Sequence, residues 1–146
     1  MTPQNLKPGE GRSYTLGRIT LVFKTPADAT AYTLVEAIEP PGASAGLHRH
    51  PTYDETHIIV AGRYECRLGE ETLMLGPGEM MLAPRGVAHS IKSLGPETGR
   101  ELIISSPGGI FEAFIAEVTR AMAQATADRP ADFRSIAGKY GIEFLE

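Results

Sequence analysis

Apolar and polar residues alternate in short runs through most of the chain, and residues that favour turns separate the runs. Alternation with a period of two is typical of strands with one buried and one exposed face. Turn sequences such as Pro40-Pro41-Gly42, Gly76-Pro77-Gly78 and Pro84-Arg85-Gly86 lie between these runs. The pattern predicts strands over residues 14–24, 31–38, 56–60, 64–68, 72–75, 80–82, 88–93 and 102–105. Short strands at this spacing indicate an all-β fold, either an antiparallel sandwich or a jelly-roll barrel.

The periodicity changes after residue 107. Apolar residues then recur three or four positions apart, which predicts an amphipathic helix over residues 110–127, stopped by Asp128-Arg129-Pro130. A second, shorter helix is predicted over residues 130–137, with Phe133 and Ile136 on its inner side, before a tail over residues 140–146. We therefore expect a barrel domain over residues 1–107 and a helical extension over residues 108–146. Packing on the outside of the barrel is the expected role of the helices, and gating a site is the alternative.

Composition and charge narrow the functional classes. The chain has 146 residues, room for one domain, and a net charge of −4, which gives no basic surface for nucleic acid or an anionic membrane. The single cysteine, Cys66, cannot form an internal disulfide, and no apolar run is long enough to span a bilayer. We expect a cytoplasmic protein that binds neither nucleic acid nor membrane.

Three of the four histidines and one glutamate are spaced as metal ligands. His48 and His50 are two residues apart, so on an extended strand their side chains face the same side, about 6.6 Å apart. Glu55 follows His50 at an odd offset, so residues 51–54 must form a loop or bulge that restores the facing, and Pro51 lies at that point. His89 comes 34 residues later and reaches this group only if the intervening hairpins fold back. The sequence thus predicts a metal site made by His48, His50, Glu55 and His89.

The spacing of these residues resembles the two motifs of the cupin superfamily. The first is Gly, five residues, His-x-His, three or four residues, Glu, six residues and Gly; residues 42–62 meet it with Gly42, His48, His50, Glu55 and Gly62. The second is Gly, five residues, Pro-x-Gly, two residues, His, three residues and Asn. Residues 78–93 meet it with Gly78, Pro84, Gly86 and His89, but Ser93 stands where Asn is usual.

The resemblance implies a double-stranded β-helix, the jelly-roll barrel of cupins, with a metal inside it and commonly a homodimer. Among cupins, the small single-domain members with all four ligands look most like the quercetin-dioxygenase-like group. The first predicted strand, residues 14–24, could supply a pairing edge for a dimer.

Three imidazoles and one carboxylate suit one divalent transition metal, which could be Fe, Mn, Ni, Co, Cu or Zn, and disfavour Ca²⁺ and Mg²⁺. An ion that prefers six ligands keeps two positions for a small-molecule substrate, or for a substrate oxygen and O2. The leading hypothesis is a dioxygenase that acts on a hydroxylated or enolisable molecule. A non-oxidative isomerase, cyclase or lyase and a binding protein without turnover are the alternatives.

The sequence also predicts roles or environments for residues outside the ligand set. His57 lies two residues beyond Glu55 and so faces the barrel interior, where His57 and Glu55 are the candidate catalytic residues and a buried structural histidine is the alternative. Tyr53 and Asp54 either support the ligands or are solvated, and Glu36 is either a buried acid or base or a solvated residue. The simplest prediction for the remaining residues of interest is a core or pocket position for Cys66, Met74, Met80 and Met81 and a solvated position for Arg49 and Arg85.

Overall fold

The computed structural model describes residues 2–124 and 129–146. The described residues form short strands followed by two helices and a last, very short strand. In chain order these are β1 (Arg12–Leu16), β2 (Ile19–Phe23), β3 (Thr33–Glu39), β4 (Ser44–Arg49), β5 (Asp54–Ala61), β6 (Tyr64–Leu68), β7 (Glu71–Leu75), β8 (Met80–Ala83), β9 (His89–Ser93), β10 (Gly99–Ser106), α1 (Ile110–Met122), α2 (Arg129–Lys139) and β11 (Glu143–Phe144).

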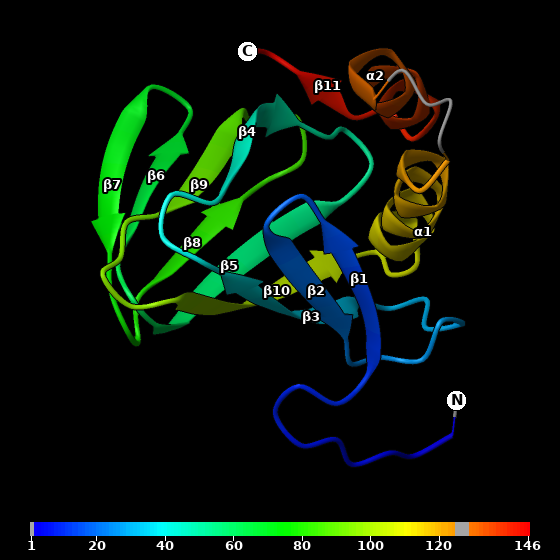
Figure 1. Ribbon diagram of the computed structural model, residues 1–146, viewed down its shortest axis with the longest axis horizontal. Helices are drawn as coiled ribbons and strands as arrows, with labels where there is room; N and C mark the ends of the chain where they lie inside the picture. Colours follow the sequence, from blue (N-terminus) through cyan, green and yellow to red (C-terminus); the bar gives the residue numbers. More distant parts are fainter. Residues whose placement is uncertain (1, 125–128) are drawn as a thin grey trace.

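The strands form two antiparallel sheets that face each other (Figure 1). One sheet has the order β1-β2-β3-β10-β5-β8, and the other has the order β11-β4-β9-β6-β7. Strands far apart in sequence are neighbours, because β10 lies between β3 and β5 and β9 lies between β4 and β6. This is the jelly-roll arrangement, and it confirms the predicted all-β fold.

The predicted strand over residues 14–24 is instead a hairpin of two strands. Gly17 has a φ of +60°, a conformation that favours glycine, and it turns the chain between Leu16 and Ile19. Tyr14 of β1 then lies opposite Leu21 of β2. The apolar positions change parity across this turn, from Tyr14 and Leu16 to Ile19 and Leu21, so the break at residues 17–18 is visible in the sequence and the prediction overlooked it.

The two helices lie together at one end of the sheets (Figure 1). The first predicted helix corresponds to α1, but α1 ends at Met122 and residues 123–124 form a turn, so the prediction of helix there is wrong; its predicted end at residues 125–127 lies outside the described residues. Phe114, Ile115 and Val118 of α1 are buried in one hydrophobic cluster with Phe23 and Val35 of the adjoining sheet. This packing is expected to stabilise the helix more than its intrinsic propensity does. Neither helix is long and apolar enough to cross a bilayer, as judged on the described ranges.

The methionine and cysteine predictions are borne out only in part. Cys66 and Met81 are buried in a second hydrophobic cluster with Tyr64 and neighbouring apolar residues. Met74 and Met80 are 50% and 51% exposed, so the prediction of a core or pocket position is wrong for both. Strand alternation explains the difference, because Met81 points into the fold and Met80, its neighbour on β8, must point out.

Glu36 fits neither of its two predicted environments. It alternates with the buried Val35 and Ala37 on β3 and therefore belongs to the outer face of the sheet, yet it is only 2% exposed. Arg100 Nε donates to Glu36 Oε2 at 2.9 Å, and the backbone N–H of Gly9 donates to Oε1 at 2.7 Å. The first residues of the chain thus cover a structural ion pair, and Glu36 does not reach the interior.

Candidate metal centre

The two sheets bring the predicted ligands together at one end of the sandwich. His48 on β4 lies directly opposite His89 on β9, in the five-stranded sheet. Glu55 is near the start of β5 in the six-stranded sheet, where it lies opposite Ser105. His50 follows the end of β4 and begins the connection between the sheets. The predicted break over residues 51–54 is present, because β4 ends at Arg49 and β5 starts at Asp54.

A β-bulge in β4 aims His48 inward. Ala45 pairs with Ile91 and His48 pairs with His89, so three steps along β4 match two steps along β9. The extra residue reverses the facing of the strand from that point, and Ala45 and His48 therefore line the same cavity. The periodicity of the sequence alone does not reveal this insertion.

The four side chains can hold one ion. The nearest ligand atoms of His48, His50, Glu55 and His89 all lie within 4.8 Å of one another. Each histidine has its Nδ1 atom next to a backbone carbonyl oxygen: Gly46 at 2.7 Å for His48, Tyr53 at 3.0 Å for His50, and Val87 at 3.0 Å for His89. Carbonyl oxygens only accept, so Nδ1 carries the hydrogen and the Nε2 lone pair is left for a metal.

The pKa values of His48 and Glu55 favour the protonation states that bind a metal ion. Burial, with a further contribution from the charge of His89, lowers the pKa of His48 to about 4, so its ring is neutral at neutral pH. Burial opposes ionisation of Glu55, but the contacts of its carboxylate with the His50, His57 and His89 rings outweigh burial and hold the pKa of Glu55 well below its usual value. A neutral imidazole and an ionised carboxylate are the ligand forms that bind metal. The donor set therefore fits a divalent transition ion.

Tyr53 packs against a candidate ligand, whereas Asp54 forms an ion pair with Arg85 on the surface. The Tyr53 ring is buried and stacks on the His50 ring with a centroid distance of 4.0 Å, and its carbonyl oxygen orients the same ring. Asp54 accepts hydrogen bonds from the backbone N–H of Arg85 at 2.9 Å and from its Nη2 at 2.9 Å. These bonds lower the pKa of Asp54 to about 2. Arg85 is thus an ion-pair partner on the surface and does not point into the cavity.

His57 lies beside the four ligands and faces the interior, as predicted. Its Nε2 is 3.3 Å from Glu55 Oε2, and its Nδ1 is 2.9 Å from Glu101 Oε2. Burial disfavours the charged ring, but the charge of Glu101 and the hydrogen bonds of both glutamates raise the pKa of His57 well above its usual value. A cationic imidazole therefore lies between the candidate metal ligand and a buried carboxylate.

Glu101 and Glu39 are interior residues that sequence analysis missed. Glu101 is fully buried on β10, and Glu39 is 3% exposed at the end of β3. Glu101, Ile103 and Ser105 share one face of β10 and are more deeply buried than Leu102 and Ile104 on the other face. The alternation was visible, but not which of its two faces is the interior.

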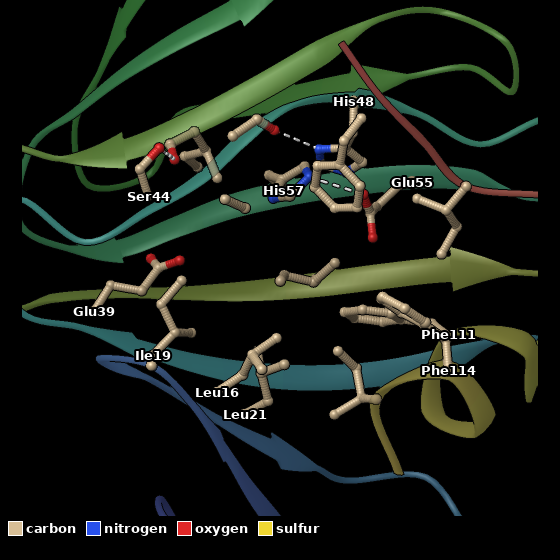
Figure 2. Close-up of a pocket in the computed structure, with 18 of the residues that line it drawn as sticks. Leu16, Ile19, Leu21, Glu39, Ser44, His48, Glu55, His57, Phe111 and Phe114 are labelled. Atoms are coloured by element: carbon tan, nitrogen blue, oxygen red, sulfur yellow. Dashed lines mark hydrogen bonds and ion pairs between the residues drawn. The ribbon is translucent and has the colours of Figure 1, made fainter. Parts of the chain in front are cut away.

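A cavity of about 470 Å³ opens from the centre into the space between the sheets. Figure 2 shows His48, His57 and Glu55 on one side of it and the apolar side chains of Leu16, Leu21, Phe111 and Phe114 on the opposite side. The C-terminal segment supplies further lining residues, Phe133, Ile142 and Phe144. Phe144 of β11 pairs with His48 of β4, and its ring stacks on the His48 ring at a centroid distance of 5.2 Å.

Comparison with known families agrees with this geometry. The model of the family described as a cupin domain matches residues 35–105, which include all four candidate ligands. The chain contains a cupin domain. This cupin is 31% identical over 88 residues to "Polyketide synthase CurC" of Streptomyces cyaneus, a match that covers 60% of this chain and 57% of that protein. The cupin thus spans less than two thirds of this curated relative.

Solved structures share the fold of this cupin at low sequence identity. KdgF from Halomonas sp. superposes with a TM-score of 0.66 at 22% identity, covering 73% of this chain and 94% of that chain. An RmlC-like cupin from Shewanella frigidimarina gives a TM-score of 0.65 at 16% identity, covering 73% and 93%. These similarities show a shared jelly-roll fold and leave the reaction to be argued from the site itself.

Proposed function

We propose that this cupin is a metal-dependent enzyme that oxidises a small hydroxylated or enolisable molecule with O2, a dioxygenase-type reaction. The observation that carries the proposal is the set of three histidines whose Nδ1 atoms contact backbone carbonyls and whose remaining ring nitrogens surround Glu55 beside an apolar cavity. Because hydrogen bonds to backbone carbonyls fix the three rings, the site keeps its ligand geometry while a substrate enters.

The ligands in this proposal are His48, His50, Glu55 and His89, with one divalent transition metal per chain. When bound, such an ion acts as a Lewis acid on a substrate hydroxyl and, if it is redox-active, also supports reaction with O2. Four protein ligands leave room at an ion that prefers six. The protein itself excludes water from the reacting groups, because His50, Glu55 and His89 are buried.

His57 and Glu55 are the residues that we propose for proton transfer. His57 lines the cavity, and its Nδ1–H is held by Glu101 at 2.9 Å, so the ring is fixed with Nε2 towards Glu55. An imidazole held in this position can give a proton to the substrate or to its product and take it back. Glu101 contacts His57 Nδ1, and we assign it the role of positioning this ring.

The cavity favours a molecule with an apolar body. Phenylalanine and aliphatic side chains form the wall opposite the metal ligands (Figure 2). The relative from Streptomyces cyaneus is called a polyketide synthase. Its name adds support for a hydroxylated, polyketide-like aromatic substrate, whose hydroxyl groups could bind the metal.

A non-oxidative isomerisation, cyclisation or lyase reaction is the second candidate. The observation that favours it is the cationic His57 between two glutamates, an acid–base group that needs no oxidant. The two candidates differ in their need for O2.

The test is oxygen uptake by protein loaded with Fe(II) or Mn(II), measured with an electrode against a panel of hydroxylated aromatic molecules. Oxygen consumption with loss of substrate, abolished in His48→Ala, supports the dioxygenase. Product formed at the same rate under strict anaerobiosis, or with Zn(II), supports the non-oxidative reaction. Protein that binds no divalent ion rejects both.

We also propose an oligomeric state and a cellular location for this protein. A homodimer and a cytoplasmic site of action agree with the resemblance to cupins and with the single cysteine. Light scattering of the purified protein gives the oligomeric mass directly, and a monomer would remove the first of these proposals.

A further inference from the structure

Two buried carboxylates line the same cavity away from the four candidate ligands. Glu39 is at the end of β3 and Glu101 is on β10, and both belong to the cavity wall. Glu39 Oε2 and Glu101 Oε1 are buried and have no hydrogen-bond partner among the described residues. Buried polar atoms are nearly always paired, so two unpaired carboxylate oxygens on a cavity wall indicate a place for a ligand group.

Glu39 lies at the end of the cavity away from Glu55, and Glu101 lies between Glu39 and the His57 ring that contacts Glu55. Along β10, Ser105 is opposite Glu55, Glu101 is four residues away, and Gly99, the partner of Glu39, is two residues further. Figure 2 shows the Glu39 carboxylate towards one end of the cavity and His48 and Glu55 towards the other, with His57 on the wall between them and Leu16 and Leu21 on the facing apolar wall. One wall of the cavity is therefore polar from Glu55 through His57 and Glu101 to Glu39, and the wall that faces it is apolar.

Chemical differences between the two carboxylates restrict what they bind. Burial, together with the nearby charge of Glu101, raises the pKa of Glu39 to about 8, so Glu39 is a neutral acid at pH 7 and can donate its proton. The second oxygen of Glu101 is already occupied, because Oε2 accepts from His57 Nδ1 at 2.9 Å, and its free Oε1 can only accept. A ligand hydroxyl group matches this pair, because it can accept a hydrogen bond from Glu39 and donate one to Glu101.

Two buried hydroxyl groups lie close to the same end of the cavity. The Tyr64 hydroxyl and Ser93 Oγ are also buried without a partner beside Gly99, where an added Cβ would lie 2.3 Å from Tyr64 Oη and 2.9 Å from Ser93 Oγ. Ser44 Oγ donates to the Ile91 carbonyl at 3.1 Å. Several polar side chains thus surround Gly99, and any side chain at that position would collide with them.

We propose that Glu39 and Glu101 form a second subsite that recognises a hydroxyl group on the end of the substrate remote from the metal. The inference rests on the proposed function for the metal end and adds that the substrate has two hydroxyl-bearing ends joined by an apolar, elongated body. Glu39 and Glu101 then determine specificity, while His48, His50, Glu55 and His89 bind the reacting end.

Three rigid probes of nearly equal shape test the subsite: 2-naphthol, 2,6-dihydroxynaphthalene and 6-methoxy-2-naphthol. Isothermal titration with metal-loaded protein gives the dissociation constant of each. We expect wild type to bind the dihydroxy probe about tenfold more tightly than 2-naphthol, and the methoxy probe no more tightly than 2-naphthol, because a methoxy group cannot donate to Glu101. Failure of the dihydroxy probe to bind more tightly than 2-naphthol, including no binding of either, overturns the proposal.

The variant Glu39→Leu keeps the contact between His57 and Glu101 and removes one half of the subsite. We expect the affinity ratio of the dihydroxy probe to 2-naphthol to fall below half of its wild-type value, and a ratio above half overturns the proposal. Glu39→Met, an apolar side chain of similar size, makes the same measurement if the leucine variant does not fold. Glu65→Gln, an exposed glutamate on β6, is the matched control and leaves the ratio unchanged.

The same titrations separate this inference from the proposed function. If wild type binds 2-naphthol equally well with and without metal, the proposed role of the metal end fails. The Glu39-dependent ratio is then still measured in His48→Ala, where its loss on adding Glu39→Leu supports the subsite and its persistence rejects it.

Discussion

The Nδ1 atom of His57 lies 2.9 Å from Oε2 of Glu101, in a pair that is almost completely buried. The two residues are 44 positions apart and come from adjacent strands, β5 and β10. This contact fixes which nitrogen of His57 carries a hydrogen towards Glu101 and which one faces Glu55. The contact connects the candidate metal ligands to the polar residues that line the rest of the cavity.

Removal of one ligand is expected to abolish metal binding. His48→Ala deletes one ring nitrogen from the four-ligand set, and we expect metal affinity to fall by more than about 100-fold, beyond the roughly 10- to 100-fold typical of residues that only orient ligands. Mass spectrometry of metal content and competition with a chelator measure the change. His57→Gln is the comparison, because it removes a ring that contacts Glu55 without being a ligand. A smaller effect of His48→Ala than of His57→Gln would show that the ligand set is wrong.

Metal removal is expected to destabilise the protein. An ion that binds only the folded state at 100 times its dissociation constant adds about 2.7 kcal/mol to the free energy of unfolding. For a chain of this size, that corresponds to a Tm higher by roughly 5–10 °C. Calorimetry before and after treatment with a chelator measures the difference, and His48→Ala is expected to show none. An equal Tm for loaded and stripped wild type would contradict the prediction.

Tyr53 is expected to act through packing and through its backbone, not through its hydroxyl. Tyr53→Phe keeps the ring that stacks on His50 and the carbonyl that accepts from it, so stability and metal affinity are expected to change little. Tyr53→Ala empties a buried site and is expected to cost about 3–5 kcal/mol. Urea unfolding and metal titration of both variants make the comparison. Equal losses in the two variants would instead assign the effect to the hydroxyl.

Glu39 is expected to make the stability of the metal-free protein fall as the pH rises. Its pKa moves from its usual 4.5 to about 8 on folding, so the folded state favours the neutral acid. The resulting stabilisation is complete below pH 4.5 and is lost as the pH rises towards about 8, by an amount on the order of a few kcal/mol. Glu39→Gln cannot titrate and lacks this component.

Urea unfolding in the presence of a chelator, at pH 5 and at pH 8, measures this effect. His57, Glu101 and Tyr64 face the same region and titrate or carry charge in both proteins. The informative quantity is therefore the difference between wild type and Glu39→Gln. If wild type loses no more stability than Glu39→Gln between the two pH values, Glu39 is already ionised at pH 5.

Some of the candidate site could be predicted because it depends on local spacing. The separation of two between His48 and His50 and the break at Pro51 are properties of a short segment, and strand geometry translates them directly into facing directions. His89 was placed by its resemblance to a motif, since no local rule joins it to residues 34 positions earlier. The opposite pairing of His48 and His89 is what the fold adds.

Residue order and spacing were enough to predict the alternation of the strands, most of the turns, the amphipathic face of α1 and four candidate ligands. The tertiary structure alone decided the bulge that turns His48 inward, the contact of His57 with Glu101, the burial of Glu39 and the placing of Phe144 against His48. The physical reason is that these features depend on register and on which face of each strand meets the other sheet. Register is fixed by packing of residues far apart in the chain, whereas periodicity reports only that a strand has two different faces.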